Sequence, residues 1–400
     1  MTYPDYIDEI ICRLEQAGAS AYIVGGSLRD MLLGVPPHDY DVATSALPEE
    51  TVRLFSDMRV IETGLRHGTV TVISHGQPVE ITTFRIDGSY TDSRHPDSVR
   101  FTSKITEDLS RRDFTVNAMA YNKRDGLTDP FGGRDDLKKR LLRAVGDPHL
   151  RFSEDALRIM RAFRFSAQLG FEIEDGTLAG AVAGASGLAD IARERIGSEF
   201  IRLITSPSPL RPLELMAEHG IFDYVLGGYV PSPRLIRAIT DMPPRDIARI
   251  AALLSDTDRD SAARILRELR LSGKQITGTL AIMTGARMCV QTPADARRLI
   301  AHTGIYAADA ARLSEVLGSS PSGAETMTQR QQNTPCSLRD LRINGKDIAG
   351  LGASGKLIGE VLNTVMERVI AEPRLNDRQT LLDMAKQILD IQQSKGNKNK

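Results

Sequence analysis

The sequence predicts an α+β protein: an N-terminal part of mixed helices and strands, followed by an all-helical remainder. Up to about residue 146, helical segments and Gly/Pro turns separate short β-like runs, namely AYIVGG, YDVAT, GTVTVIS, PVEITTF and LLRAV. From Asp147 onward β-branched alternation nearly disappears, and helical patterns such as EDALRIMRAFRFSAQLG and SAARILRELRLSG replace it. A chain of 400 residues exceeds what one hydrophobic core usually serves, so several domains are expected.

Composition is that of an ordinary soluble globular protein, with 41% hydrophobic and 26% charged residues. The three cysteines, Cys12, Cys289 and Cys336, are scattered and lack CxxC spacing, which indicates neither a disulfide framework nor a zinc site. The N-terminus resembles an acidic amphipathic helix, and no run approaches the length of a membrane span. We therefore expect a soluble, cytoplasmic protein with no membrane partner.

The net charge of -1 gives no overall attraction to nucleic acid, so a polyanion would have to meet local basic clusters. Such clusters occur at residues 111–112, 138–143, 158–164 and at the C-terminal KGNKNK. Taken singly, each is more typical of a solvated surface than of a binding site.

The stretch YIVGGSLRD predicts a phosphate-binding turn between a strand and a helix. The strand-like run ends at Gly25 and Gly26, Ser27 is a candidate helix cap, and Arg29 falls in the expected first turn. Glycines allow close backbone approach, and a helix start favours negative charge. The spacing matches neither GxGxxG nor GxxxxGK[ST], which disfavours dinucleotide and P-loop sites. A Gly-Gly turn alone is equally compatible with a purely structural role.

The stretch HDYDVAT places Asp39 and Asp41 two residues apart in a strand-like run, so both carboxylates should face one side of a sheet. Two such carboxylates repel each other, and a divalent metal such as Mg²⁺ relieves the repulsion. The same spacing in SDTDRD, residues 255–260, lies in a polar turn where solvent screens the charges. A third acid, Glu80, could join the site from a neighbouring strand or face solvent.

Seven motifs follow one another over roughly residues 20 to 205: GGSLRD, HDYDVAT, GLRHGTVTV, RRDFTVNAMAY, LTDPFGGRDDL, RFSEDALRIMRAFRF and ARERIGSEFIRLI. Together they resemble the bacterial class II tRNA nucleotidyltransferase (CCA-adding) and poly(A) polymerase family, within the polymerase β nucleotidyltransferase superfamily. The helical remainder matches this family only loosely. The resemblance implies a polymerase β-like nucleotidyltransferase head with a mixed sheet and helices.

The family arrangement is a head, neck, body and tail, with catalysis in the head and tRNA bound along the length. On this chain we expect the nucleotidyltransferase head at 1–146, a helical neck with the base-reading helix at 147–206, a helical body at 207–318 and a helical tail with a basic C-terminus at 337–400. Residues 319–336 are polar, rich in Ser, Gln and Thr and almost without aliphatic residues, which indicates a linker or loop.

The resemblance also assigns roles to individual residues. Asp39 and Asp41 would carry catalysis and hold Mg²⁺, while Asp113 and Asn117 would lie near the ribose and the phosphates. The expected nucleotide-binding residues are Gly26, Arg29, Arg112, Asp155, Arg158, Arg161 and Arg164. In the reaction, the 3′-hydroxyl of an RNA attacks the α-phosphate of a nucleoside triphosphate and pyrophosphate leaves, with two metal ions activating the hydroxyl and neutralising the leaving charge.

Base selection can be predicted from hydrogen-bond chemistry. Cytosine and adenine present an amine donor beside a ring-nitrogen acceptor, whereas uracil and guanine present a carbonyl beside a protonated nitrogen. Asp155 would accept from the amine and Arg158 would donate to the ring nitrogen, so this pair would accept C and A but leave U and G unpaired. Both residues lie in a helical pattern whose apolar members, Ala156, Leu157, Met160 and Phe163, should face the core. Without the other motifs, a salt-bridged surface helix is the simpler interpretation.

The expected function is the addition of C, C and A to the 3′ end of tRNA from CTP and ATP; the oligomeric state is unknown. The segment after the aspartate pair reads TGLRHGTVTVI and lacks the Arg-Arg-rich signature of poly(A) polymerases, and FRIDGSYTDSRHPDSVRF provides the loop that CC-only enzymes lack. Alternatives are an A-adding or poly(A) polymerase relative, or a catalytically inactive tRNA-binding module. The seven histidines form no helical cluster, so no phosphohydrolase activity is expected.

Overall fold

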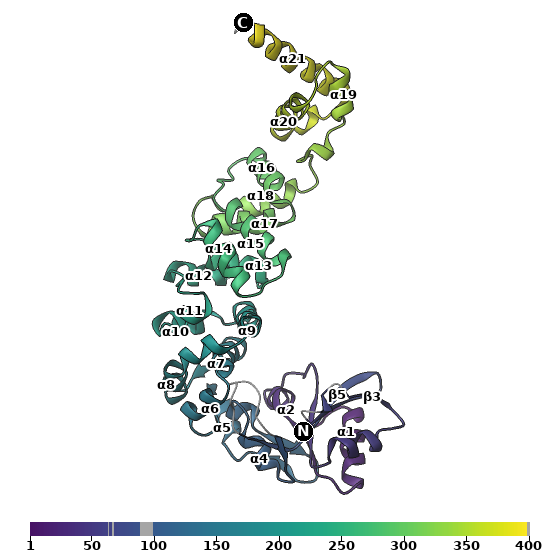
Figure 1. Ribbon diagram of the computed structural model, residues 1–400, viewed down its shortest axis with the longest axis vertical. Helices are drawn as coiled ribbons and strands as arrows, with labels where there is room; N and C mark the ends of the chain where they lie inside the picture. Colours follow the sequence, from purple (N-terminus) through teal and green to yellow (C-terminus); the bar gives the residue numbers. More distant parts are fainter. Residues whose placement is uncertain (63, 66–67, 89–98, 398–400) are drawn as a thin grey trace. The chain divides into compact units, whose positions relative to one another are not determined.

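The computed structural model describes residues 1–62, 64–65, 68–88 and 99–397. The chain forms two compact units, Met1–Val230 and Pro231–Lys400. Figure 1 shows a sheet in the purple to blue part of the ribbon and helices through the green and yellow part, which confirms the predicted α+β class. No helix among these residues is long and apolar enough to cross a membrane. The finer division into head, neck, body and tail stays a prediction.

The first unit is built around a seven-stranded sheet of order β3-β4-β5-β2-β1-β8-β9. Its strands are β1 (Ala21–Val24), β2 (Asp41–Thr44), β3 (Arg59–Ile61), β4 (Thr69–Ser74), β5 (Gln77–Thr83), β8 (Ala120–Asn122) and β9 (Gly126–Thr128). Neighbouring strands are antiparallel except β2 and β5, which run parallel. The β-branched alternation predicted along β4 is confirmed, because Val70 and Val72 are buried and their neighbours are half-exposed.

Helices and a small hairpin surround this sheet. Helix α1 (Asp5–Gln16) packs against β1 and β4 and buries Ile7, Ile10, Ile11 and Leu14, which recur at helical spacing. The remaining elements of this region are α2 (Gly25–Leu32), α3 (Pro48–Leu54), β6 (Arg85–Asp87), β7 (Val99–Phe101), α4 (Ile105–Ser110), α5 (Gly133–Lys139) and β10 (Leu141–Leu142). All five β-like runs of the sequence therefore contain a strand.

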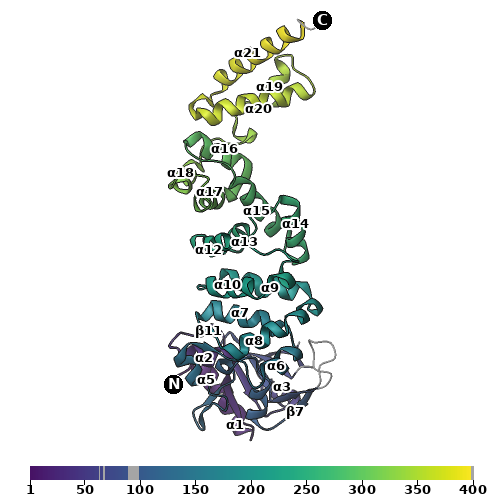
Figure 2. The same cartoon turned by 90° about the vertical axis from the view of Figure 1, so that its left-hand side faces the viewer.

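The rest of the first unit is mainly helical. Its helices are α6 (Pro148–Glu154), α7 (Leu157–Leu169), α8 (Asp175–Ala183), α9 (Arg193–Thr205), α10 (Leu210–Glu218) and α11 (Phe222–Val225). Helix α7 packs against α9 and α10, and the three lie side by side in Figure 2. The expectation of an all-helical neck is wrong in one detail: β11 (Glu172–Ile173) pairs with β10 in parallel and buries Ile173.

The second unit is helical throughout its described residues. Its helices are α12 (Pro233–Asp241), α13 (Asp246–Leu253), α14 (Arg259–Glu268), α15 (Gly273–Gly285), α16 (Pro293–Thr303), α17 (Ala307–Val316), α18 (Ala324–Gln331), α19 (Gly345–Gly350), α20 (Lys356–Ala371) and α21 (Arg378–Asn397). A hydrophobic cluster confined to residues 341–389 joins α19, α20 and α21.

Residues 319–336 are not the simple linker or loop that their polar composition predicts. They contain α18, which packs against α16 and α17. Ala324 and Thr328 are buried in this contact, and the Thr328 hydroxyl donates to the Ala324 carbonyl at 2.8 Å. The buried face of α18 therefore consists of a small residue and a threonine whose hydroxyl is hydrogen-bonded to the backbone of the same helix. It needs no large aliphatic side chains.

Candidate active site

The sheet brings the two predicted motifs together at the end of β1. Because β1 and β2 are antiparallel, Val24 lies opposite Asp41, and the Gly-Gly turn follows at once. Because β2 and β5 are parallel, Glu80 lies beside Asp41 on the other side. Asp39 is not in the strand as expected but in the bend before it, where its side chain is exposed. The alternation of side chains along a strand therefore does not explain how the two aspartates come together. Both nevertheless line the same pocket.

The turn after β1 leaves little room for a side chain at Gly25. Gly25 has a φ of +70°, and a Cβ there would lie 3.2 Å from Arg112 Nη1 and 3.4 Å from Asp41 Oδ2. Helix α2 begins at Gly25 itself, so Ser27 lies inside the helix and is not its cap. The Ser27 hydroxyl instead donates to the Val24 carbonyl at 2.9 Å and accepts from the Asp41 N–H at 3.5 Å. Arg29 lies in the last turn of this short helix, not the first.

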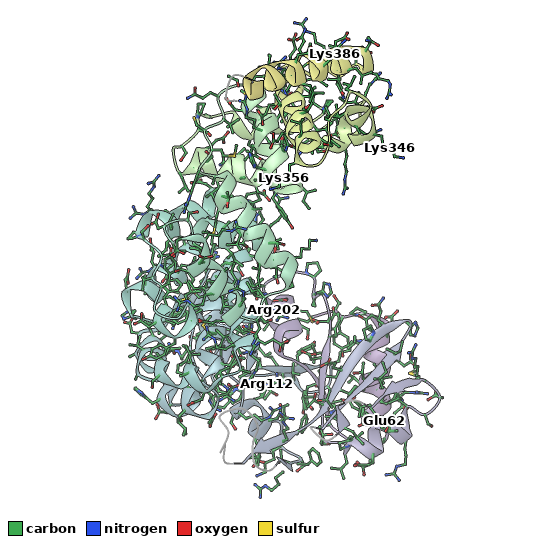
Figure 3. The ribbon with its side chains drawn as sticks, turned by 45° about the horizontal axis from the view of Figure 1, so that its top comes forward. Glu62, Arg112, Arg202, Lys346, Lys356 and Lys386 are labelled. Atoms are coloured by element: carbon green, nitrogen blue, oxygen red, sulfur yellow. The ribbon has the colours of Figure 1, made fainter. Side chains whose placement is uncertain are left out.

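A pocket of about 690 Å³ in the first unit gathers every predicted site residue. Its lining includes Gly26, Arg29, Asp39, Asp41, Glu80, Arg112, Asp113, Asn117, Asp155, Arg158, Arg161 and Arg164. Figure 3 labels two of its basic residues, Arg112 after α4 and Arg202 on α9. The structure thus brings the residues together, whereas their individual roles stay predictions.

The carboxylates of this pocket are crowded. Burial and the nearby charges of Glu80 and Asp39 together raise the pKa of Asp41 to about 6, against the opposing charge of Arg112. This donor set fits a divalent cation, which would relieve the repulsion between the carboxylates. Among the described residues, no group of three or more His, Cys, Asp or Glu side chains is placed to hold a metal ion.

A chain of hydrogen bonds links α2 to α7 along the pocket. Arg29 Nη1 donates to Asn117 Oδ1 at 2.9 Å, and Asn117 Nδ2 donates to Asp113 Oδ1 at 3.3 Å. Asp113 Oδ2 accepts from Arg161 Nη2 at 2.6 Å and from Arg161 Nε at 2.9 Å. Burial alone would raise the pKa of Asp113, but Arg161 and Asn117 lower it below its ordinary value. Asp113 therefore stays charged and orients Arg161.

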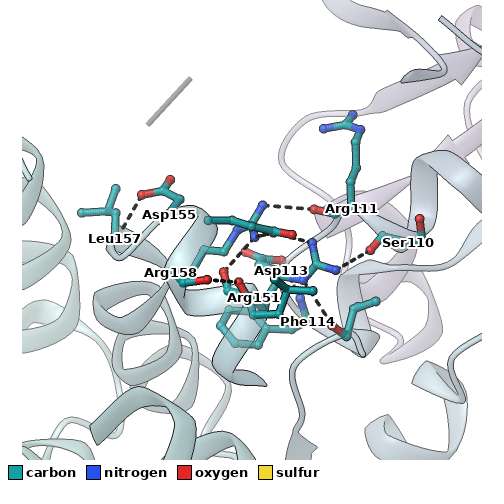
Figure 4. Close-up of polar contacts among 12 residues, drawn as sticks. Ser110, Arg111, Asp113, Phe114, Arg151, Asp155, Leu157 and Arg158 are labelled. Carbon is teal, nitrogen blue, oxygen red and sulfur yellow. Dashed lines mark hydrogen bonds and ion pairs between the residues drawn. The ribbon is translucent and has the colours of Figure 1, made fainter. Parts of the chain in front are cut away.

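Asp155 and Arg158 do not lie on one continuous helix, contrary to the sequence pattern. Helix α6 ends at Glu154, Asp155 is extended, and α7 begins at Leu157, whose N–H donates to Asp155 Oδ1 at 3.0 Å. Figure 4 shows Asp155 and Arg158 beside each other, each held by other partners. The other oxygen of Asp155, Oδ2, pairs with Arg195 Nη2 at 3.3 Å.

Three acceptors bind the guanidinium of Arg158. Its guanidinium forms an ion pair with Glu154 and donates to the Arg151 carbonyl at 2.9 Å and to the Arg111 carbonyl at 3.2 Å. The last of these contacts crosses from α7 to the loop after α4 (Figure 4). The predicted apolar members of this segment, Ala156, Leu157, Met160 and Phe163, are all buried, which confirms that part of the pattern.

The pocket also contains residues that the sequence did not predict: Arg111, Phe165, Gln168, Arg195 and Arg202. A signal for two of them existed in ARERIGSEFIRLI, where Arg195, Glu199 and Arg202 share one face at helical spacing. Glu199 on that face accepts from Arg164 Nε at 2.5 Å. The segment expected to support addition of the terminal A, FRIDGSYTDSRHPDSVRF, lies mostly outside the described residues.

Three family models match successive parts of the chain: the poly A polymerase head domain at 21–143, the RNA- and SrmB-binding site of polymerase A at 170–235, and tRNA nucleotidyltransferase domain 2 at 245–385. The CCA-adding enzyme of Leuconostoc mesenteroides is 37% identical over 396 residues, covering 97% of this chain and 98% of that protein. The CCA-adding enzyme of Geobacillus kaustophilus is 36% identical over 384 residues, covering 93% and 94%.

Among solved structures, the CCA-adding enzyme of Bacillus stearothermophilus in complex with CTP superimposes with a TM-score of 0.83 at 31% identity. The match covers 98% of this chain and 100% of that structure. The Thermotoga maritima CCA-adding enzyme shares the fold at 21% identity, with a TM-score of 0.71 over 97% of this chain and 96% of that one. The protein therefore belongs to the tRNA nucleotidyltransferase and poly(A) polymerase family, among its CCA-adding enzymes.

Proposed function

We propose that the protein completes the 3′ end of tRNA by adding C, C and A, using CTP and ATP and releasing pyrophosphate. The observation that carries this proposal is the pocket in which Asp39 and Asp41 share one lining with Asp155 and Arg158. The 37% identity to a CCA-adding enzyme over nearly the full chain supports it, as does the likeness to a CTP complex. Action on tRNA would place the protein in the cytoplasm, with head, neck, body and tail binding the RNA.

In the proposed mechanism, the triphosphate lies against the Gly25–Gly26 turn, where Arg29 and Arg112 supply charge-assisted hydrogen bonds. Asp39 and Asp41 would hold Mg²⁺, which when bound neutralises phosphate charge and lowers the pKa of the attacking hydroxyl. The tRNA 3′-oxygen forms a bond to the α-phosphorus, the bond to pyrophosphate breaks, and the hydroxyl proton passes to solvent. The arginines of the pocket stabilise the negative charge that gathers on the departing pyrophosphate.

Choice of base falls to Asp155 and Arg158 in this proposal. Arg195 orients Asp155, and the carbonyls of Arg111 and Arg151 orient Arg158. Held in this way, the two side chains offer an acceptor and a donor that match the edges of both C and A. U and G would leave the polar groups of the site unpaired, which is costly in a site built on hydrogen bonds.

The test is to incubate the protein with tRNA lacking its last three, two or one nucleotides and with each labelled triphosphate. Stepwise incorporation of C, C and then A, ending there, supports the proposal. Incorporation of A alone, or an extended run of A, would assign an A-adding or poly(A) polymerase function. RNA binding without any incorporation would favour the inactive tRNA-binding module, a reading that the paired carboxylates of the pocket argue against.

A further inference from the structure

Phe165 lies where three arginines of the pocket converge. Its side chain is 7% exposed and lines the pocket directly. The guanidinium carbons of Arg164, Arg161 and Arg29 lie 3.7, 5.2 and 5.5 Å from the centre of its ring. These distances fall within the range of cation–π contacts. One aromatic ring thus contacts cations from both α2 and α7.

A second aromatic ring packs against Phe165. Phe114 packs edge-on against Phe165, with ring centres 5.8 Å apart and an interplanar angle of 78°. Phe114 is fully buried and precedes Thr115 in the segment that also carries Asp113 and Asn117. Aromatic rings prefer such an edge-to-face arrangement. This contact favours the observed orientation of the Phe165 ring.

The three arginines that contact this ring repel one another. Each also has a polar partner of its own: Asp30 pairs with Arg29 at 2.7 Å, Asp113 with Arg161, and Glu199 with Arg164. Burial lowers the pKa of Arg164, and the charge of Arg161 lowers it further, whereas Glu199 opposes the shift. The three carboxylates lie on different elements, so they do not by themselves keep the cations together.

We propose that Phe165 is a positioning residue for nucleotide binding, whose ring gathers Arg29, Arg161 and Arg164 before the triphosphate arrives. This inference rests on the proposed function of the same pocket. The negative face of the ring attracts all three guanidiniums and so offsets part of their repulsion. Without the ring, the repulsion among the guanidiniums would no longer be offset, and nucleotide binding would have to bring them together again.

A purely structural role for Phe165 makes a different prediction, and the chain offers a matched control. Phe163 lies two residues earlier on the same helix, is fully buried and does not line this pocket. Phe163→Leu and Phe165→Leu both remove a buried ring from α7. If Phe165 only fills the core, the two variants should lower the melting temperature by similar amounts. They should then also have the same affinity for the nucleotide.

The experiment measures CTP binding directly by calorimetry with the full-length protein, together with KM and kcat for CMP incorporation into tRNA lacking CCA. We expect Phe165→Leu to weaken CTP binding and raise KM by roughly tenfold, with a smaller change in kcat. Phe163→Leu should leave both constants near wild type. Equal constants for Phe165→Leu and wild type would overturn the inference.

Fluorinated phenylalanines at position 165 provide a second test that does not depend on tolerance of leucine. Mono-, tri- and pentafluorination progressively weaken the negative face of the ring while nearly preserving its shape. The Kd for CTP should rise along this series at position 165 and stay constant along the same series at position 163. A flat series at position 165 would overturn the positioning role. Absence of CMP incorporation by the wild type would instead overturn the proposed function, because CTP binding is measured independently.

Discussion

Arg161 of α7 donates two hydrogen bonds to one oxygen of Asp113, at 2.6 and 2.9 Å, and so joins the helix that follows Asp155 to the segment after α4. Asp113 also accepts from Asn117, which accepts in turn from Arg29. The pocket arginines Arg29 on α2 and Arg161 on α7 are thus connected through one buried carboxylate. Disturbing this carboxylate should affect both stability and catalysis.

We predict that Asp113→Asn lowers the free energy of unfolding by about 2 kcal/mol, less than for a fully buried pair because a third of the Arg161 side chain is exposed. The kcat/KM for CTP should fall at least about tenfold. A double-mutant cycle with Arg161→Gln separates this pair from its surroundings, because two residues that act through each other give effects smaller together than their sum. Strictly additive effects would show that the pair does not act as a unit.

Gly25→Ala should abolish nucleotide addition. The new Cβ would lie 3.2 Å from Arg112 Nη1 and 3.4 Å from Asp41 Oδ2, in a backbone conformation with φ of +70°. Gly126→Ala is the matched control, since Gly126 has a φ of +74° and open space where its Cβ would lie. Both variants carry a similar backbone penalty of about 1 kcal/mol. Equal activities of the two in a CMP incorporation assay would contradict the role assigned to the turn.

Asp155→Ala should relax the preference for C and A. The substitution removes the acceptor expected to bind the exocyclic amine and leaves Arg195 without this partner. The measurement compares incorporation of all four nucleoside triphosphates into tRNA lacking its last nucleotide. We expect the ratio of A to G incorporation to fall by at least about tenfold. Unchanged selectivity with a lower overall rate would reject Asp155 as a base-reading residue.

We predict that Asp108 makes part of the free energy of unfolding depend on pH. Burial alone would raise its pKa, but Arg111, Arg112 and hydrogen bonds from Arg111 and the Arg85 N–H lower it below the ordinary value of 3.8. A carboxyl whose pKa is lowered by folding stabilises the folded state above its unfolded pKa and loses this effect as the pH falls through the folded pKa. The stability difference between wild type and Asp108→Asn should therefore be largest near neutral pH and shrink below about pH 3.8. Urea unfolding at several pH values measures it, and a constant difference would contradict the prediction.

The sequence predicted the fold class, the five strand-containing runs and many of the residues of the pocket, because periodicity and motif order are local properties. The break at Asp155 could not be predicted from periodicity, which continues from α6 into α7 while the Asp155 side chain bonds to the Leu157 N–H. Helix α18 was missed because its buried face uses Ala324 and Thr328 instead of aliphatic residues.

Two parts of the site depend on contacts between distant segments, and the sequence does not show these contacts. Arg195 acquires its place from an ion pair with Asp155, 40 residues earlier in the chain. Phe165 fits an ordinary apolar position, and only the folded chain brings Arg29 over its ring. A motif therefore identified the cluster of charges, whereas the groups that orient those charges required the tertiary structure.

We infer that Asp41 supports nucleotidyl transfer to tRNA in this pocket. The most direct measurement is CMP and AMP incorporation into tRNA lacking CCA, in the presence of Mg²⁺, by wild type and by Asp41→Asn, with tRNA affinity measured alongside. We predict that the wild type adds C, C and A and then stops, whereas Asp41→Asn binds tRNA with near-normal affinity and adds nothing. Nucleotide addition by Asp41→Asn at the wild-type rate would contradict the claim.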